Sequence, residues 1–216
     1  NGASYNCGYT SGRTTAFYGS ITNNGTIYTS SAGGVVKMMG PALINSGSIS
    51  VTGTFNFDTT TTVSGSGVFN SANQNINANG NITLLSNVTF SPTAGLSVQT
   101  GGDLNLNGYV LTFNAGQFAA YSGTTVNSPG TFRTQGNASV YPVNGSNFNA
   151  NFNVNSGSST GGNTGFGDVF YGNVTIDNGA TMNCGWTSGR TTNFYGNITN
   201  NGTLTTSSTG GVVRIR

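Results

Sequence analysis

The chain contains no histidine and no glutamate, and only 5% of its 216 residues are charged. Without histidine, neither histidine general acid–base catalysis nor a serine nucleophile activated by histidine is available. Glycoside hydrolysis requires two carboxylates, one on each side of the bond that is cleaved. The chain has only four acidic residues, and the two that lie closest in sequence, Asp168 and Asp177, are nine positions apart. The sequence therefore predicts that this protein is not an enzyme and has no catalytic residue and no cofactor.

Basic residues are sparse as well. Six Lys and Arg give a net charge of +2, and they are too scattered to follow a phosphate backbone. No apolar run approaches the ~20 residues of a membrane-spanning helix. Gly-rich stretches at 100–108 and 161–170 faintly resemble a calcium-binding coil, but each holds one Asp, whereas a hard cation takes several oxygen ligands. We expect no nucleic-acid partner, no membrane insertion and no metal site.

What the chain does have is an internal repeat. Residues 1–39 align without a gap onto 178–216, with 28 of the 39 pairs identical. Identity at one fixed offset, as between Cys7 and Cys184, is typical of tandem duplication. We interpret 1–177 as one repeat unit, 178–216 as the start of the next, and 1–216 as one continuous segment of a longer array. A single protein with duplicated ends is the alternative.

The segments between turns alternate apolar and polar residues with a period of two. "SISVTGTFNF" places Ile49, Val51, Phe55 and Phe57 on one face, and the stretch 147–155 alternates in the same way. This pattern predicts short strands with one buried face. Frequent Asn-Gly pairs suit sharp corners, although they also suit the hairpins of a sandwich.

A shorter period favours stacked coils over hairpins. "FYGNVTIDNGATM" begins at Phe170, and the similar "FYGNITNNGTLT" begins at Phe194. We therefore predict an all-β fold, a right-handed parallel β-helix (β-solenoid) with coils of roughly 20–25 residues. Gly/Ser/Thr-rich excursion loops are expected at 29–34 and 156–167. At roughly 22 residues per coil, one unit over 1–177 would make about eight coils and rise about 40 Å.

The sequence "SGRTT" occurs twice, and it is the most distinctive segment that we expect to be exposed. In each copy an Arg lies near aromatic residues, so the loop is a candidate contact for a glycan or a neighbouring filament. The alternative is an Arg that stacks on an aromatic ring to hold the loop. The candidate contact residues are Arg13, Tyr9, Arg190 and Trp186.

The two cysteines, Cys7 and Cys184, occupy the same position of the repeat. Stacked repeats would hold them too far apart to bond to each other. We expect two equivalent buried thiols. The alternative is a thiol that cross-links neighbouring molecules.

Coils such as "YGNVTIDNGATMNCG" and "YGNITNNGTLTTSSTGG" resemble repeats of giant surface adhesins of gliding Bacteroidota and, more loosely, filamentous-haemagglutinin-type β-helices. The resemblance implies an extracellular protein, secreted or attached to the cell surface. We expect a structural segment of a fibre, filament or adhesin stalk, whose partners are adjacent repeats end to end, with identical filaments as further candidate partners. The alternatives are an adhesin module that binds glycans or surfaces through its loops, and a subunit of a functional amyloid.

Overall fold

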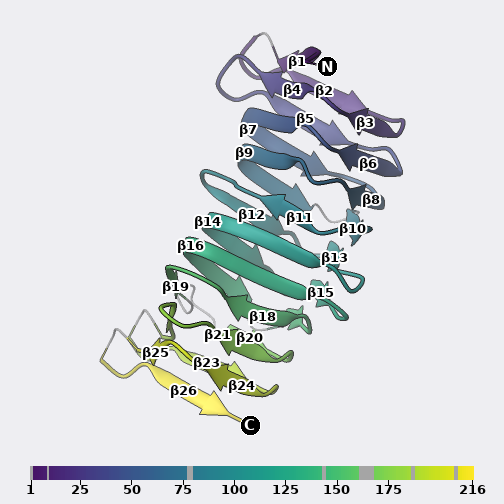
Figure 1. Ribbon diagram of the computed structural model, residues 1–216. Coiled ribbons are helices and arrows are strands. Elements are labelled where there is room, and N and C mark those ends of the chain that lie inside the picture. The colour runs from purple at the N-terminus through teal and green to yellow at the C-terminus, as the bar shows by residue number, and fades with distance from the viewer. Residues whose placement is uncertain are drawn as a thin grey trace.

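The computed structural model describes residues 2–8, 10–76, 80–142, 145–160, 168–185, 188–206 and 209–216. These residues form strands and turns without any helix, and the strands stack as a β-solenoid of about 9 turns (Figure 1). Every strand pairing within the described residues is parallel. The fold class that the sequence predicts is confirmed, and the hairpin alternative is wrong. Of the excursion loop expected at 156–167, however, Ser158–Thr160 form a paired strand, and 161–167 lie outside the described residues.

Three columns of stacked strands make up the solenoid, and we call them ladders 1, 2 and 3. Ladder 1 contains, in order along the axis, β1 (Ser4–Gly8), β4 (Thr26–Thr29), the first halves of β7 (Ser48–Phe57) and β9 (Val68–Ile76), β11 (Val88–Phe90), the first halves of β14 (Val110–Ala120) and β16 (Thr131–Pro142), β18 (Asn151–Val154), β21 (Val174–Ile176) and β24 (Ile198–Asn200). Ladder 2 contains β2 (Thr14–Phe17), β5 (Val35–Met38), the second halves of β7 and β9, β12 (Gly95–Val98), the second halves of β14 and β16, β19 (Ser158–Thr160), β22 (Thr181–Asn183) and β25 (Thr203–Thr205).

Ladder 3 contains β3 (Ile21–Asn23), β6 (Ala42–Asn45), β8 (Thr61–Ser64), β10 (Asn81–Leu84), β13 (Asp103–Asn105), β15 (Thr125–Asn127), β17 (Asn147–Phe148), β20 (Asp168–Phe170), β23 (Thr191–Phe194) and β26 (Val212–Ile215). The backbone N–H of Tyr171 donates to the carbonyl of Phe148 and so joins β20 to β17. Each turn of the solenoid therefore takes one strand from each ladder.

The strand registers on ladder 1 give the length of a turn. Residues that lie next to each other on successive turns differ in number by the length of one turn. This difference is 20 for Arg133 and Asn153, and 24 for Asn173 and Asn197, which are hydrogen-bonded pairs. The other turns measured on this ladder fall between these values, as where Ser4 pairs with Thr26. The predicted coil length is therefore confirmed.

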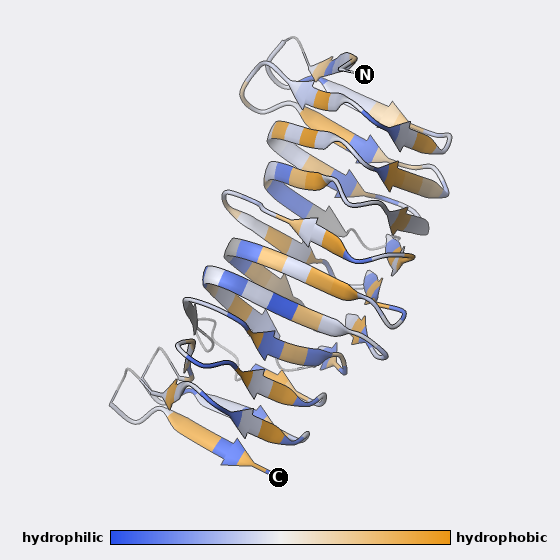
Figure 2. Ribbon diagram, in the orientation of Figure 1, coloured by the Kyte–Doolittle hydropathy of each residue, from blue (hydrophilic) through white to orange (hydrophobic). Residues whose placement is uncertain are grey.

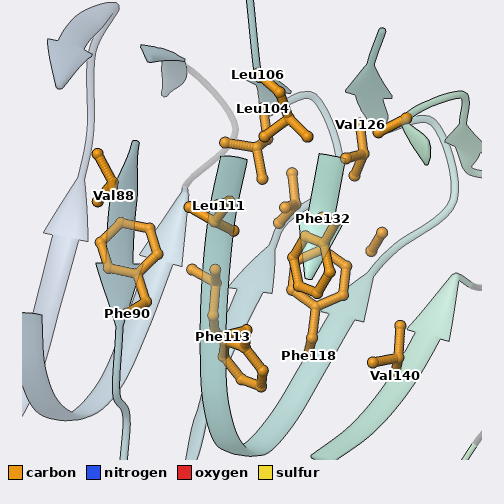
Figure 3. Packing of buried hydrophobic residues seen from close by; sticks show 14 of the residues in the cluster. Val88, Phe90, Leu104, Leu106, Leu111, Phe113, Phe118, Val126, Phe132 and Val140 are labelled. Atoms are coloured by element: carbon orange, nitrogen blue, oxygen red, sulfur yellow. The ribbon is translucent and has the colours of Figure 1, made fainter. Parts of the chain in front are cut away.

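A narrow apolar column fills the space between the ladders, because every second residue of a strand points inward. Strands therefore alternate between hydrophobic and hydrophilic residues along their length (Figure 2). Phe113, Phe118 and Phe132 converge from ladders 1 and 2, with ring centroids of Phe118 and Phe132 4.4 Å apart (Figure 3). Leu104 and Val126 enter from ladder 3 and are fully buried. The pattern read at Ile49, Val51, Phe55 and Phe57 is likewise buried as predicted.

Glycine is required where the backbone of one turn crosses close to the next. A Cβ at Gly25 would lie 2.0 Å from the carbonyl oxygen of Ala3, and a Cβ at Gly47 would lie 2.0 Å from that of Gly25. Neither glycine has a positive φ, so close approach rather than backbone freedom selects glycine at this corner.

The second copy of the repeat lies one ladder further round than the first. β21 is the ninth strand of ladder 1, so eight turns separate it from β1, and β22, the equivalent of β1, follows it on ladder 2. In the same way β23 lies on ladder 3 and β24 on ladder 1, whereas their equivalents β2 and β3 lie on ladders 2 and 3. The repeat therefore spans eight and one-third turns.

The prediction of about eight coils per unit agrees with this value, and the structure adds the extra third of a turn. The prediction assumed one uniform coil length, but the turns that begin at Ser48 and Thr131 are shorter than the turn that begins at Ser4. Local pairing within the two copies is nevertheless the same, because Ser4 pairs with Thr26 and the equivalent Thr181 pairs with Thr203. The same sequence therefore forms the same strands on different ladders.

Candidate functional site

The repeated loops have the same backbone geometry in both copies. Gly12 and Gly189 take φ values of 74° and 75°. The hydroxyl of Ser11 donates to the carbonyl of Ala32 at 2.9 Å, and that of Ser188 donates to the carbonyl of Thr209 at 2.8 Å. Each loop is therefore held against the loop of the following turn by an equivalent bond.

The structure describes only two of the four predicted loop contacts. Arg13 is exposed and Arg190 is half-buried, and their carbonyls accept equivalent backbone bonds from Val35 and Val212. Tyr9 and Trp186 lie outside the described residues, so the predicted stacking on these rings stays a prediction. Arg13 lies at the corner between ladders 1 and 2, and Arg190 lies at the corner between ladders 2 and 3, so the fold does not bring the two arginines together.

A cation–π contact occurs instead at the C-terminal end. The guanidinium of Arg216 lies 5.7 Å from the ring centroid of Tyr195. Tyr195 in turn stacks on Tyr171, with centroids 5.0 Å apart. The stacking of the two tyrosines could have been predicted from the sequence, because both belong to the "FYGN" motif, which begins at Phe170 and again at Phe194.

Cys7 and Cys184 are both buried and form no disulfide, so the prediction of equivalent buried thiols is confirmed. Burial raises the pKa of Cys7 to about 11. Burial also raises the pKa of Cys184 to about 12; a hydrogen bond with Thr192 lowers it, and the nearby charge of Asp168 raises it. Thiols in this state are poor nucleophiles at neutral pH.

Asp168 is fully buried beside this second thiol, in register with Thr192 of the next turn. Sequence reasoning did not single out this burial, although Asp168 lies two residues before the buried Phe170 and therefore on the same face of the strand. Within the described residues, no group of three or more His, Cys, Asp and Glu side chains comes together to hold a metal ion. A membrane-spanning apolar helix is also absent from the described part of the chain.

The C-terminal turn exposes side chains that are buried in the first copy. Ile215 is 70% exposed, whereas its equivalent, Met38, is fully covered by the following turn. Leu204 and Val213 are only partly buried at this end. Among the described residues, the three end strands β24, β25 and β26 each pair with a strand on one side only.

Asn200 shows the same difference for a polar side chain. In the first copy, the amide of its equivalent Asn23 donates to Oδ1 of Asn45 in the next turn at 2.8 Å. Asn200 keeps the local bond of this position, since its Oδ1 accepts from the N–H of Gly202 at 3.2 Å, but its side chain is exposed. The side-chain amide of Asn200 is therefore exposed at the position where Asn23 donates to the amide oxygen of the next turn.

The N-terminal turn opens onto a hollow of about 530 Å³, whose lining includes Tyr5, Phe17, Ile21, Asn23 and Ile27. Tyr5 is 56% exposed there. Two of the equivalent residues in the second copy are covered: Met182, the equivalent of Tyr5, is buried, and the ring of Phe194, the equivalent of Phe17, stacks on Phe170 of the preceding turn at 5.4 Å. An apolar side chain from a preceding turn would thus fill this hollow.

A smaller, polar depression of about 420 Å³ lies on the outer face of ladder 1. Its lining includes Arg133, Asn153, Thr175 and Asp177. These groups are engaged with one another or with close neighbours: the guanidinium Nε of Arg133 donates to Oδ1 of Asn153 at 3.0 Å, and Asn153 donates to the carbonyl of Thr175. This chain of bonds ties successive turns together.

No protein-family model, no curated protein and no solved structure matches this chain. Its two open ends and its repeated loops are the candidate functional surfaces.

Proposed function

We propose that the chain is a structural segment of a long tandem-repeat protein that forms an extracellular fibre, filament or adhesin stalk. The observation that supports the proposal is that both copies of the repeat form the same strand pairing within one continuous solenoid: Ser4 pairs with Thr26, and the equivalent Thr181 pairs with Thr203. In the first copy, residues 40–57 form the turn that covers Val36 and Met38.

The side chains of β6 and β7 show what such cover provides. Asn45 receives the amide of Asn23, and Phe55 and Phe57 pair in register with Val36 and Met38. Lys37 also forms an ion pair with Asp58 at 3.2 Å, and its equivalent in the last turn is Arg214. A further turn of this type would meet each exposed group of the last turn with a matching one.

The loops favour a structural role over the alternative of a glycan- or surface-binding module. Ser11 and Ser188 direct their hydroxyls to the neighbouring loop rather than outward. The amyloid alternative gains no support from turns whose length varies along the axis, because amyloid stacks identical segments in register.

Immunogold electron microscopy on the source cells tests the proposal. Antibodies raised against the 216-residue chain should decorate thin filaments outside the cell along their length. Pre-immune serum is the control. Label that is confined to the cell interior, or that never follows a filament, would reject the proposed role.

A further inference from the structure

We infer that Asn178 is a site of spontaneous covalent modification, at which the side-chain amide is converted to a carboxylate with release of ammonia. The residue lies at the corner between β21 on ladder 1 and β22 on ladder 2. The inference goes beyond the proposed function and does not depend on it.

This reaction needs an asparagine whose following residue has a free and unhindered backbone N–H. The backbone nitrogen attacks Cγ of the asparagine, a new C–N bond closes a succinimide ring, and the side-chain nitrogen leaves as ammonia. Water then opens the ring at either of its carbonyls and leaves aspartate or isoaspartate. Glycine is the most favourable following residue, because it has no Cβ to hinder the attack. Water is the only co-reactant.

Exposure alone does not single out one site. The sequence contains seven Asn-Gly pairs, and the structure describes both residues in four of them: Asn24-Gly25, Asn107-Gly108, Asn178-Gly179 and Asn201-Gly202. The asparagine is exposed in each of these four pairs. The difference between the pairs lies in the N–H of the glycine.

Three of the four glycine N–H groups already donate a hydrogen bond. The bonds join Gly108 to the carbonyl of Pro129 at 2.6 Å, Gly25 to Oδ1 of Asn23 at 3.2 Å, and Gly202 to Oδ1 of Asn200 at 3.2 Å. Each of these nitrogens must give up its bond in a local opening before it can attack. The three corners are therefore protected while the protein is folded.

The N–H of Gly179 has no acceptor among the described residues. The turn at this corner is closed by the next residue instead, since the N–H of Ala180 donates to the carbonyl of Asp177 at 3.0 Å. A Cβ at Gly179 would meet no atom within 4 Å, so the space beside this residue is open. Asn178 thus combines an exposed amide with a free and unhindered nucleophile.

The modification would change how this corner is held. Either product adds a negative charge next to Asp177, whose carboxylate accepts from the amide of Asn155 in the preceding turn at 2.9 Å. Isoaspartate also adds a backbone carbon to the turn that Ala180 closes. Because like charges so close to each other repel, the modified corner should be held less tightly to the preceding turn.

Site-resolved peptide mapping by mass spectrometry tests the inference, with the purified chain kept at pH 8 in native buffer and, in parallel, in denaturant. In native buffer we expect Asn178 to convert about tenfold faster than Asn24, Asn107 and Asn201, the factor that one hydrogen bond contributes to a local opening. In denaturant the four rates should converge, because every glycine N–H is then free. Equal native rates at the four sites, or a faster rate at any of the other three, would overturn the inference.

Two variants at one position test whether the glycine N–H decides the rate. Asn200→Ala removes the oxygen that accepts from Gly202, so Asn201 should convert several times faster than in the unmodified chain, while the rate at Asn178 stays the same. Asn200→Asp keeps an acceptor oxygen at this position and is the matched control, in which Asn201 should remain slow. Asn200 is exposed, so both variants should fold. An unchanged rate at Asn201 in Asn200→Ala would overturn the free N–H as the cause.

Discussion

At the scale of single residues, the solenoid depends on side chains that repeat along its axis. Phe170 stacks on Phe194, and Tyr171 stacks on Tyr195 one position further along the chain. On the outer face, Gln135 donates to Asn155 at 3.1 Å and Asn155 donates to a carboxylate in the next turn. Uncharged residues suit such columns, because identical charges about 4.8 Å apart would repel one another. This explains a chain with only 5% charged residues.

Replacing Gly47 by alanine should destabilise the fold. The new Cβ would lie 2.0 Å from the carbonyl oxygen of Gly25, and neither backbone can move without disturbing the stacked turn. We expect a loss of about 1–3 kcal/mol in the free energy of unfolding, measured by urea denaturation. Gly19→Ala is the control, since no atom lies within 4 Å of a Cβ at that position. Equal stability of the two variants would show that this close approach is wrong.

The buried thiols give a second prediction at this scale. At pH 8 both thiols should react slowly with a thiol reagent in the folded protein and quickly in denaturant, because the reactive thiolate is scarce when the pKa values are about 11 and about 12. The folded-state pKa lies above the ordinary value of 9.0, so the folded state holds the proton longer, and stability should fall as pH rises from 9 toward 11. Rapid labelling of the native protein at pH 8 would contradict the described burial.

At the scale of elements, the turn is the unit of structure, and its length varies. Within β7 and β9 the register shifts between Val51 and Thr54, where one strand carries an extra residue. Irregularities of this kind absorb small differences in length, so shorter and longer turns stack on one axis. The ladder pairing, rather than a fixed residue count, keeps the strands aligned.

Deleting one whole turn should therefore leave a folded solenoid. Removal of residues 68–88 would place Thr89, the register partner of Val68, on Ser48. Because stability in repeat folds is roughly a sum over neighbouring units, we expect cooperative unfolding with an m-value about a tenth smaller. Deleting residues 68–78 alone is the control, since the turn would then lack its strands on ladders 1 and 2. An unfolded whole-turn variant would show that the turns are not interchangeable units.

Most of the strands and corners could be predicted from the period-two alternation of apolar residues and from the Asn-Gly pairs. The inward positions at Phe148, Phe152 and Val154 follow directly from a period of two. The one-third-turn offset was not predictable, because the sequence does not show which corners omit a residue. Asp168 lies two residues before Phe170 on β20, whose three residues are all buried, but only the stacking of turns places its carboxylate near Cys184. Of the predicted loop contacts, the structure places Arg13 and Arg190 but not their aromatic neighbours.

At the scale of the whole molecule, the repeat of eight and one-third turns has a consequence for an array. Each unit starts one ladder further round than the unit before it, so a given loop moves to the next corner in each successive unit. Three units are needed before the same residues return to the same ladder. An array of identical units would thus present its loops at all three corners, while every junction keeps the same local pairing.

The most direct test of this account is a cryo-EM structure of a chain of four fused units, each with the sequence of residues 1–177. We predict one uninterrupted solenoid in which each unit advances roughly 40 Å, at about 4.8 Å per turn. Equivalent strands should move one ladder per unit, so that the fourth unit occupies the ladders of the first. Units that fold as separate bodies, or that span a whole number of turns and keep each strand on its ladder, would contradict the account.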